Sequence, residues 1–104
     1  MITVLTDENP DTLAFIRNLK DRLPDLIEPD YGLLDNLLSL EVLTRRQYED
    51  IRSEKGAAYK RSEAVLDLLA SEDASEDQCR KFLIALRKTG QQHIVNFIEQ
   101  NGGQ

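Results

Sequence analysis

The chain has 104 residues, of which 40% are apolar and 31% charged, and this composition is ordinary for a single small helical domain. Its formal net charge of −6 disfavours nonspecific binding to nucleic-acid phosphates or anionic lipid, because both attract a positive protein surface. No apolar run approaches the roughly 20 residues that span a bilayer. With one cysteine and no secretory leader in the sequence, we expect a cytoplasmic protein.

The first predicted helix begins at Asn9-Pro10, after an irregular lead over residues 1–8. Asn is a favoured N-cap, and Pro fits the first helical position. An apolar stripe with helical spacing follows, formed by Leu13, Ile16, Leu19, Leu23 and Ile27. Pro24 stands inside this stripe, and a proline in a helix interior costs ~3 kcal/mol because it removes a hydrogen bond and clashes with the preceding turn. We therefore expect this helix to be kinked or broken near Leu23.

The middle of the chain predicts two shorter helices. The first covers about residues 31–40 and turns its leucines inward. These are Leu33, Leu34, Leu37 and Leu38. The second begins at Thr44-Arg45-Arg46-Gln47, which has the Thr and Gln spacing of a capping box. It is expected to reach about Glu54 and to bury Tyr48 and Ile51.

Two amphipathic helices form the proposed centre of the fold, joined by an acidic, serine-rich turn. The first covers about residues 57–70, and the second covers about 75–88, with Ser75 and Gln78 as another capping box. Their apolar sets are Val65, Leu66, Leu68 and Leu69, and Cys79, Phe82, Leu83 and Leu86. Neither helix can bury its apolar side alone, so we expect them to pack on each other and on further helices.

Gly90 predicts a left-handed helix stop, and a last helix is expected over about residues 91–100. Residues 102–104 are expected to form a flexible tail or a linker to a further domain. Six helices with short connections and no strand pattern predict an all-α bundle over residues 9–101.

Side chains that could carry chemistry are isolated in this sequence. His93 is the only histidine and has no nearby partner for a metal site, so it is interpreted as solvated or capping. Cys79 falls in an apolar stripe, whereas a catalytic cysteine needs a base and partial exposure. The acidic pairs fall in loops or on wet helix faces, not in a cleft with two different environments. We expect no enzyme activity, no cofactor and no metal.

Surface charge is the remaining signal. The first and fourth predicted helices carry Arg17, Lys20, Arg22, Lys60 and Arg61. The second and third, with the link between them, carry Asp35, Glu41, Glu49, Asp50 and Glu54. If the two groups lie on opposite sides, copies could associate head to tail, which propagates into a filament unless it closes. Arg45, Arg46 and Arg52 blur this segregation, and from the charges alone a mixed wet surface is the better interpretation.

Four segments resemble, in their order and spacing, the caspase recruitment domain (CARD), one branch of the death-fold superfamily. They are Leu33-Leu34-Asp35-Asn36-Leu37-Leu38, Tyr48-Glu49-Asp50-Ile51-Arg52, Val65-Leu66-Asp67-Leu68-Leu69 and Cys79-Arg80-Lys81-Phe82-Leu83-Ile84-Ala85-Leu86. The resemblance covers about residues 10–100. The sister branches, namely the death, death effector and pyrin domains, share the same fold. The segment over residues 21–32 is several residues longer than is typical of the family.

The resemblance implies a six-helix antiparallel Greek-key bundle (a death fold) with a bent first helix. It implies homotypic CARD–CARD binding that recruits a caspase, kinase or adaptor in apoptosis or in innate-immune or inflammasome signalling, in some cases by helical filament assembly. The partner would be another CARD-containing protein or a further copy of this chain, with no small-molecule substrate. The implied basic side is Arg17, Lys20, Lys60 and Arg61. The implied acidic side is Asp35, Glu41, Glu49 and Asp50.

Two alternatives stay open at this point. One is a monomeric CARD-like or other death-fold domain that acts as a one-to-one binder or inhibitor. The other is a nucleic-acid-binding helical domain that uses Arg45, Arg46 and Arg52. The net negative charge and the lack of aromatic residues among these arginines count against the second.

Overall fold

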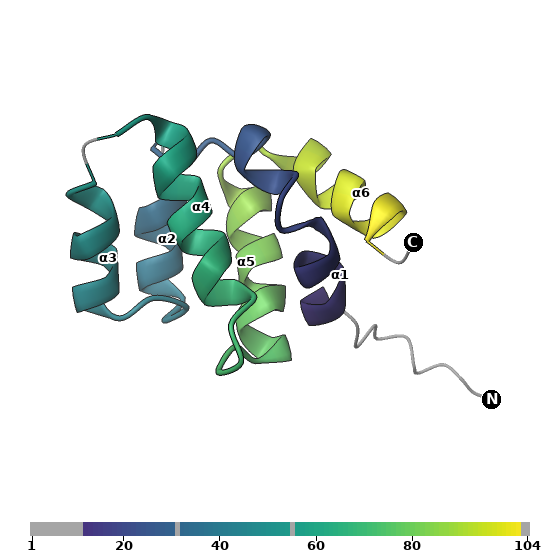
Figure 1. The fold of residues 1–104 in the computed structure, drawn as a ribbon, viewed down its shortest axis with the longest axis horizontal. Coiled ribbons are helices and arrows are strands. Elements are labelled where there is room, and N and C mark those ends of the chain that lie inside the picture. The colour runs from purple at the N-terminus through teal and green to yellow at the C-terminus, as the bar shows by residue number, and fades with distance from the viewer. Residues whose placement is uncertain (1–11, 31, 55, 103–104) are drawn as a thin grey trace.

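The computed structural model describes residues 12–30, 32–54 and 56–102, and in these residues it is all helical, with no strand. The expected lead over residues 1–8 and the expected helix start at Asn9-Pro10 lie outside the described residues. The elements are α1 (Thr12–Leu19), the 3₁₀ helix η2 (Leu23–Asp25), α2 (Leu33–Ser39), α3 (Arg45–Arg52), α4 (Ala58–Leu69), α5 (Glu76–Lys88) and α6 (Gln92–Asn101). The six α-helices in these described residues confirm the predicted all-α fold (Figure 1).

The first helix is broken, as Pro24 predicted. The α-helix stops at Leu19, and the chain resumes helical geometry in η2, with Pro24 in its first turn. A proline ring clashes with the carbonyl of the residue four positions earlier, here Lys20, so the α-helix ends just before that residue. At the start of a new helix the missing N–H costs nothing, and this is the position that Pro24 takes.

Both predicted capping boxes are present. The amide of Gln47 donates to Thr44 Oγ1 at 3.1 Å, and the amide of Gln78 donates to Ser75 Oγ at 3.1 Å. In each box the glutamine side chain accepts from the backbone N–H of its capping residue. Gly90 ends α5 with φ +79°, which confirms the predicted left-handed stop. α3 ends at Arg52, slightly before the expected limit.

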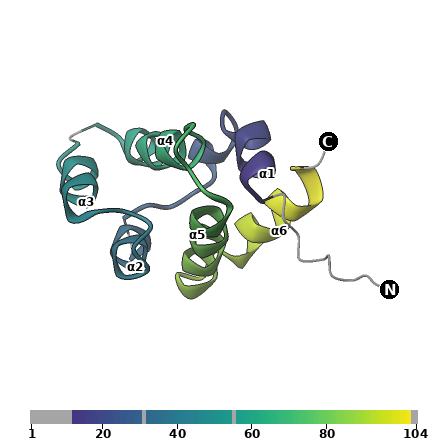
Figure 2. The ribbon, with the colours of Figure 1, turned by 90° about the horizontal axis from the view of Figure 1, so that it is seen from below.

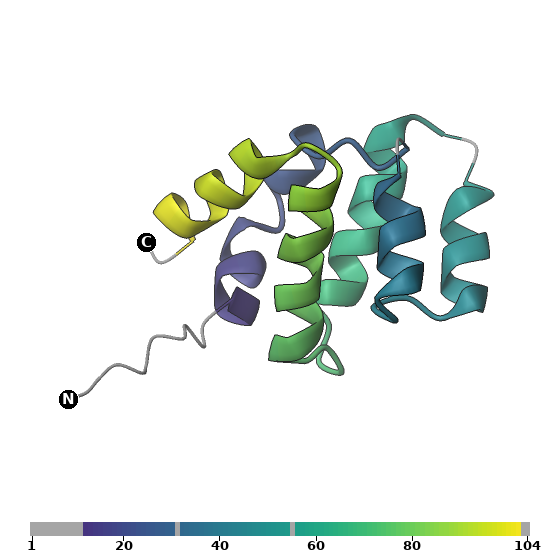
Figure 3. The ribbon, with the colours of Figure 1, turned by 180° about the vertical axis from the view of Figure 1, so that it is seen from behind.

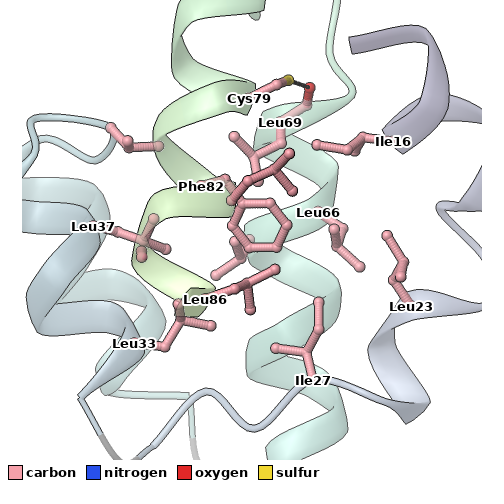
Figure 4. Packing of buried hydrophobic residues seen from close by; sticks show 14 of the residues in the cluster. Ile16, Leu23, Ile27, Leu33, Leu37, Leu66, Leu69, Cys79, Phe82 and Leu86 are labelled. Carbon is pink, nitrogen blue, oxygen red and sulfur yellow. Dashed lines mark hydrogen bonds between the residues drawn. The ribbon is translucent and has the colours of Figure 1, made fainter. Parts of the chain in front are cut away.

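The helices surround a core to which α4 and α5 both contribute. The backbone of α5 packs against α1, α2 and α6, whereas that of α4 packs against η2, α1 and α3. Helices α2 and α3 therefore form one end of the molecule, and α1 and α6 form the other (Figures 1 and 3). Figure 4 shows the ring of Phe82, which is fully buried, among Leu66 of α4, Leu86 of α5 and Leu37 of α2.

Side-chain contacts to the backbone fix the ends of the bundle. Gln91 is 7% exposed and bonds both backbone groups of Glu28: its Oε1 accepts from the Glu28 N–H at 2.8 Å, and its Nε2 donates to the Glu28 carbonyl at 3.0 Å. The carboxylate of Glu76 in α5 accepts from the backbone N–H groups of Thr12 and Leu13, at 3.0 and 2.9 Å. Glu76 thus caps the first turn of α1 from another helix, where a negative charge complements the helix dipole.

Candidate interaction surface

The four predicted acidic residues share the α2–α3 end of the molecule. Asp35 lies in α2, Glu41 follows that helix, and Glu49 and Asp50 lie in α3, which packs on α2. All four are exposed. The structure therefore gathers them on neighbouring elements, and it leaves their carboxylates accessible to a partner.

Two of these carboxylates have partners within the molecule. Asp35 accepts a hydrogen bond from the Tyr48 hydroxyl, and this bond raises the pKa of Tyr48 above its ordinary value. The guanidinium of Arg52 lies over the Tyr48 ring, 5.5 Å from its centroid. Glu49 is 3.9 Å from Arg45 one turn earlier, which is a weak, exposed pair. Asp35 is thus the most constrained of the four.

Glu41 and Asp50 are the least engaged of the acidic set. Within the described residues, no cation lies at ion-pair distance from either carboxylate. Glu41 also has a left-handed backbone with φ +64°, a conformation that an L-residue other than glycine seldom adopts. Its side chain is exposed in the link between α2 and α3.

The predicted basic residues in α1 and directly after it make internal contacts that sequence reasoning missed. Arg17 donates from Nε to the Ala70 carbonyl at 3.2 Å and from Nη2 to the Ser71 carbonyl at 2.8 Å. Ala70 and Ser71 follow the last residue of α4. A cation at the C-terminus of a helix interacts favourably with the helix dipole. Lys20 Nζ lies 3.0 Å from Asp67, whose hydrogen bond and charge raise the pKa of Lys20.

Arg61 of α4 is similarly engaged. It binds both carboxylate oxygens of Asp30, at 2.7 and 2.9 Å, and its Nη1 donates to the carbonyls of Glu54 and Gly56. The hydrogen bond to Asp30 raises the pKa of Arg61. Lys60, its neighbour in sequence, is exposed, and no described carboxylate lies at ion-pair distance from it. Of the four residues on the implied basic side, Lys60 is the one for which the described residues supply no such bond.

The face formed by α1, η2 and α4 also carries carboxylates. Tyr59 is 41% exposed on this face, and the negative charges of Glu63, Asp25 and Asp21 raise its pKa. Together with Asp67 they offset the lysines and arginines that the sequence pattern singled out. The charge of this face is therefore mixed, whereas the α2–α3 end keeps an exposed acidic set.

A polar hollow of about 320 Å³ lies between α2, α3 and the start of α4. Asp30, Asp35, Tyr48, Arg52 and Arg61 contribute to its lining. Arg61 belongs to the basic side and Asp35 to the acidic side that the family resemblance implies, yet both line the same hollow. The two charged groups therefore meet at this hollow.

Cys79 and His93 lie in the environments that the sequence predicted, one buried and the other in solvent. Cys79 is fully buried, donates its thiol to the Leu69 carbonyl and has its pKa raised to about 12, first by burial. His93 is exposed on α6. Over the part of the chain that the structure describes, no three His, Cys, Asp or Glu side chains gather as around a metal ion. In the same residues, no helix combines the length and apolar character needed to cross a membrane.

Comparison with known proteins gave one match. A family model described as "CARD: Caspase recruitment domain" matches residues 13–101 of the chain, which is most of its length. The comparisons with curated proteins and with solved structures gave no match.

Proposed function

The chain belongs to the caspase recruitment domain family, and from this premise we propose that it recruits a caspase, kinase or adaptor through homotypic CARD–CARD contacts. Membership makes it a protein–protein interaction domain of signalling, because domains of this family bind other CARD or death-fold domains. The pathway we propose is apoptotic or innate-immune signalling, including inflammasomes, in the cytoplasm. Its partner is another CARD or a further copy of the chain.

The observation that carries the choice of surface is the exposed acidic set at the α2–α3 end. Glu41, Glu49 and Asp50 have no strong internal partner among the described residues, so a cation of another domain can approach them without breaking the fold. We propose Asp35 as a fourth member that keeps its Tyr48 bond. Charge complementarity of this kind mainly sets partner choice and the rate of approach.

The proposed basic side consists of Arg17, Lys20, Lys60 and Arg61. Lys60 is its most accessible member, because the other three already bind backbone carbonyls or carboxylates. Those three can share their charge with a partner, but reversing any of them also removes an internal contact. Tests of this side therefore need a folding control, whereas tests of the acidic side need it less.

Ion pairs alone give too little affinity for stable recruitment. Exposed pairs contribute about 0.2–1 kcal/mol each, and salt screens them. Binding must therefore come from several contacts at once and from repetition along an assembly. This energetic argument supports helical filament formation as the proposed mode of signalling.

A second candidate is a domain that stays monomeric and binds or inhibits one CARD partner. It is favoured by the mixed charge of the α1–η2–α4 face, where Asp67, Glu63 and Asp25 accompany the cations. On that account the acidic side binds the basic side of a different protein, and this chain has no strong surface for its own copies.

Light scattering and negative-stain microscopy of the purified domain at low and high salt separate these candidates. The filament account predicts large particles that shrink as salt rises, because screening weakens the charged contacts. A monomer at every salt concentration supports the one-to-one binder. Pull-down against a panel of CARD domains then tests the family-level proposal, and a panel without any binder contradicts it.

A further inference from the structure

The outer side of α5 carries an apolar residue within a ring of positive charge. Ile84 is 38% exposed, and it is one of three large apolar side chains that reach solvent to this extent in the described residues. Residues three and four positions away on a helix are its surface neighbours. Here all of them are basic: Arg80, Lys81, Arg87 and Lys88. We refer to Ile84 with these four residues as the α5 knob.

Three of the four basic residues of the α5 knob hold exposed internal ion pairs, and Lys88 holds none among the described residues. Arg80 pairs with Glu76 at 3.4 Å, Lys81 with Asp77 at 3.2 Å and Arg87 with Glu99 at 3.7 Å. The side chains of Arg80, Lys81 and Arg87 are each at least one third exposed. Exposed pairs of this kind contribute at most about 1 kcal/mol each, so a carboxylate of a second copy can compete for these cations. The knob therefore keeps a positive surface around an accessible isoleucine.

A groove of the opposite character lies between α3 and α4. It has a volume of about 260 Å³, and its apolar lining comes from Ile51, Ala64 and Leu68. Asp50 and Asp67 lie at the same groove. We refer to these residues as the α3–α4 groove. It offers an apolar floor for an aliphatic side chain and carboxylates for the cations around that side chain.

We propose that the α5 knob of one copy docks into the α3–α4 groove of a second copy. Apolar atoms of Ile84 meet an apolar floor, and the surrounding arginines and lysines meet the carboxylates of the groove. Asp50 has no internal ion pair among the described residues, and Asp67 forms an exposed ion pair with Lys20. Both halves of the contact are thus complementary in charge and in polarity.

The two surfaces lie on different sides of the molecule. Helix α4 is toward the viewer in Figure 1, and α5 is toward the viewer after the half turn of Figure 3. Figure 2 shows the same separation from below, with α4 on one side and α5 on the other. A contact between unlike surfaces is heterologous, so each copy keeps one knob and one groove for further neighbours.

This contact extends the proposed function, because it supplies apolar burial that ion pairs lack, and it shares Asp50 with the acidic side. One knob and one groove cover far less than the roughly 1,200–2,000 Å² of a stable interface, so the contact acts together with others. Loss of the isoleucine side chain in Ile84→Ala should weaken self-association by about tenfold. Leu26→Ala is the matched control, since Leu26 is exposed to a similar degree, 43%, but lies outside both surfaces.

Site-specific cross-linking tests the contact directly. One copy carries Ile84→Cys, and a second copy, marked by an affinity tag, carries Ala64→Cys in the groove. The native Cys79 is retained, because it is fully buried and does not compete for the reagent. Mild oxidation should join the two variants into a covalent dimer. The pair Leu26→Cys with Ala64→Cys should give at least tenfold less dimer.

Sedimentation of the unmodified protein in the same buffer separates the outcomes. Association without the cross-link between positions 84 and 64 overturns the knob-and-groove contact and leaves the proposed function standing. A protein that neither associates nor cross-links overturns both the contact and the filament. If a different protein that binds the domain protects Ala64→Cys from oxidation, while copies of the domain fail to cross-link, that protein occupies the groove and the proposal is wrong.

Discussion

Replacing Gln91 by alanine should destabilise the domain strongly although it changes no apolar contact of the core. Gln91 lies at the junction of α5 and α6, and its amide bonds the N–H and the carbonyl of Glu28 as well as the Thr89 hydroxyl. Alanine removes all three bonds and leaves the backbone of Glu28 without its partner. This clamp holds the connection between η2 and α2, which leads into the acidic end of the molecule.

The magnitude follows from the burial of these groups. A net hydrogen bond contributes about 0.5–1.5 kcal/mol, and a buried polar group left unpaired costs about 1–3 kcal/mol. Water can enter part of the space that the shorter alanine side chain leaves and can bond some of the freed groups. We therefore expect Gln91→Ala to lower the free energy of unfolding by about 2–4 kcal/mol. Gln92→Ala is the matched control, because the Gln92 side chain is exposed and bonds only Asn96 among the described residues.

Urea unfolding followed by circular dichroism measures this difference. Both variants should unfold with the same dependence on denaturant, so the shift in midpoint reports stability alone. The Gln92→Ala change should stay within about 0.5 kcal/mol of the parent. Equal midpoints for the two variants would refute the argument that the Gln91 clamp holds the connection.

Other substitutions and a pH series test further parts of the structure. Phe82→Ala should cost about 3–5 kcal/mol in the same unfolding assay, because a fully buried ring leaves a cavity; a loss below 1 kcal/mol would contradict the packing in Figure 4. Glu41→Gly should stabilise the fold by up to about 1 kcal/mol, since φ +64° suits glycine, and no gain would count against a left-handed Glu41. Glu76→Gln should cost about 1 kcal/mol through the weakened cap of α1, with Glu72→Gln as the unaffected control. The pKa of Cys79 is raised to about 12 from an ordinary value of 9.0, so its contribution to stability is full below pH 9 and is lost between pH 9 and about 12. Cys79→Ala should flatten that part of the stability profile, and a loss of stability as steep as the parent's would disprove this assignment.

Local features of the fold were predictable because their signals lie within a few residues. Thr44 with Gln47 and Ser75 with Gln78 are capping boxes of three-residue spacing, and both formed as predicted. Pro24 broke the first helix because the steric conflict of a proline is with its own preceding turn. Such effects depend little on the rest of the chain.

The internal roles of the predicted basic residues were not predictable from the sequence pattern. Arg17 bonds the Ala70 and Ser71 carbonyls, and Arg61 bonds the carboxylate of Asp30, 31 residues away. Helical spacing says that these side chains leave the core, but it does not say which distant group they meet. The sequence therefore located the charges on their helices and missed their partners.

The acidic side shows the opposite case. Glu49 and Asp50 follow one another on a short helix whose buried face was fixed by Tyr48 and Ile51, so their exposure followed from helical geometry. Whether they bind a partner depends on a second molecule, on which neither helical spacing nor the bundle packing bears. Their role is thus a proposal that needs a binding experiment.

The most direct measurement is sedimentation velocity of the domain carrying Glu49→Lys with Asp50→Lys, alone and mixed with a CARD that binds the parent protein. Glu72→Lys is the control, because Glu72 is exposed in the loop between α4 and α5 and belongs to neither the acidic nor the basic side. Circular dichroism establishes that each variant remains folded. We expect the double reversal to abolish association and the control to retain it. If the folded double variant associates as strongly as the parent, the acidic side is not the binding surface and the central claim is wrong.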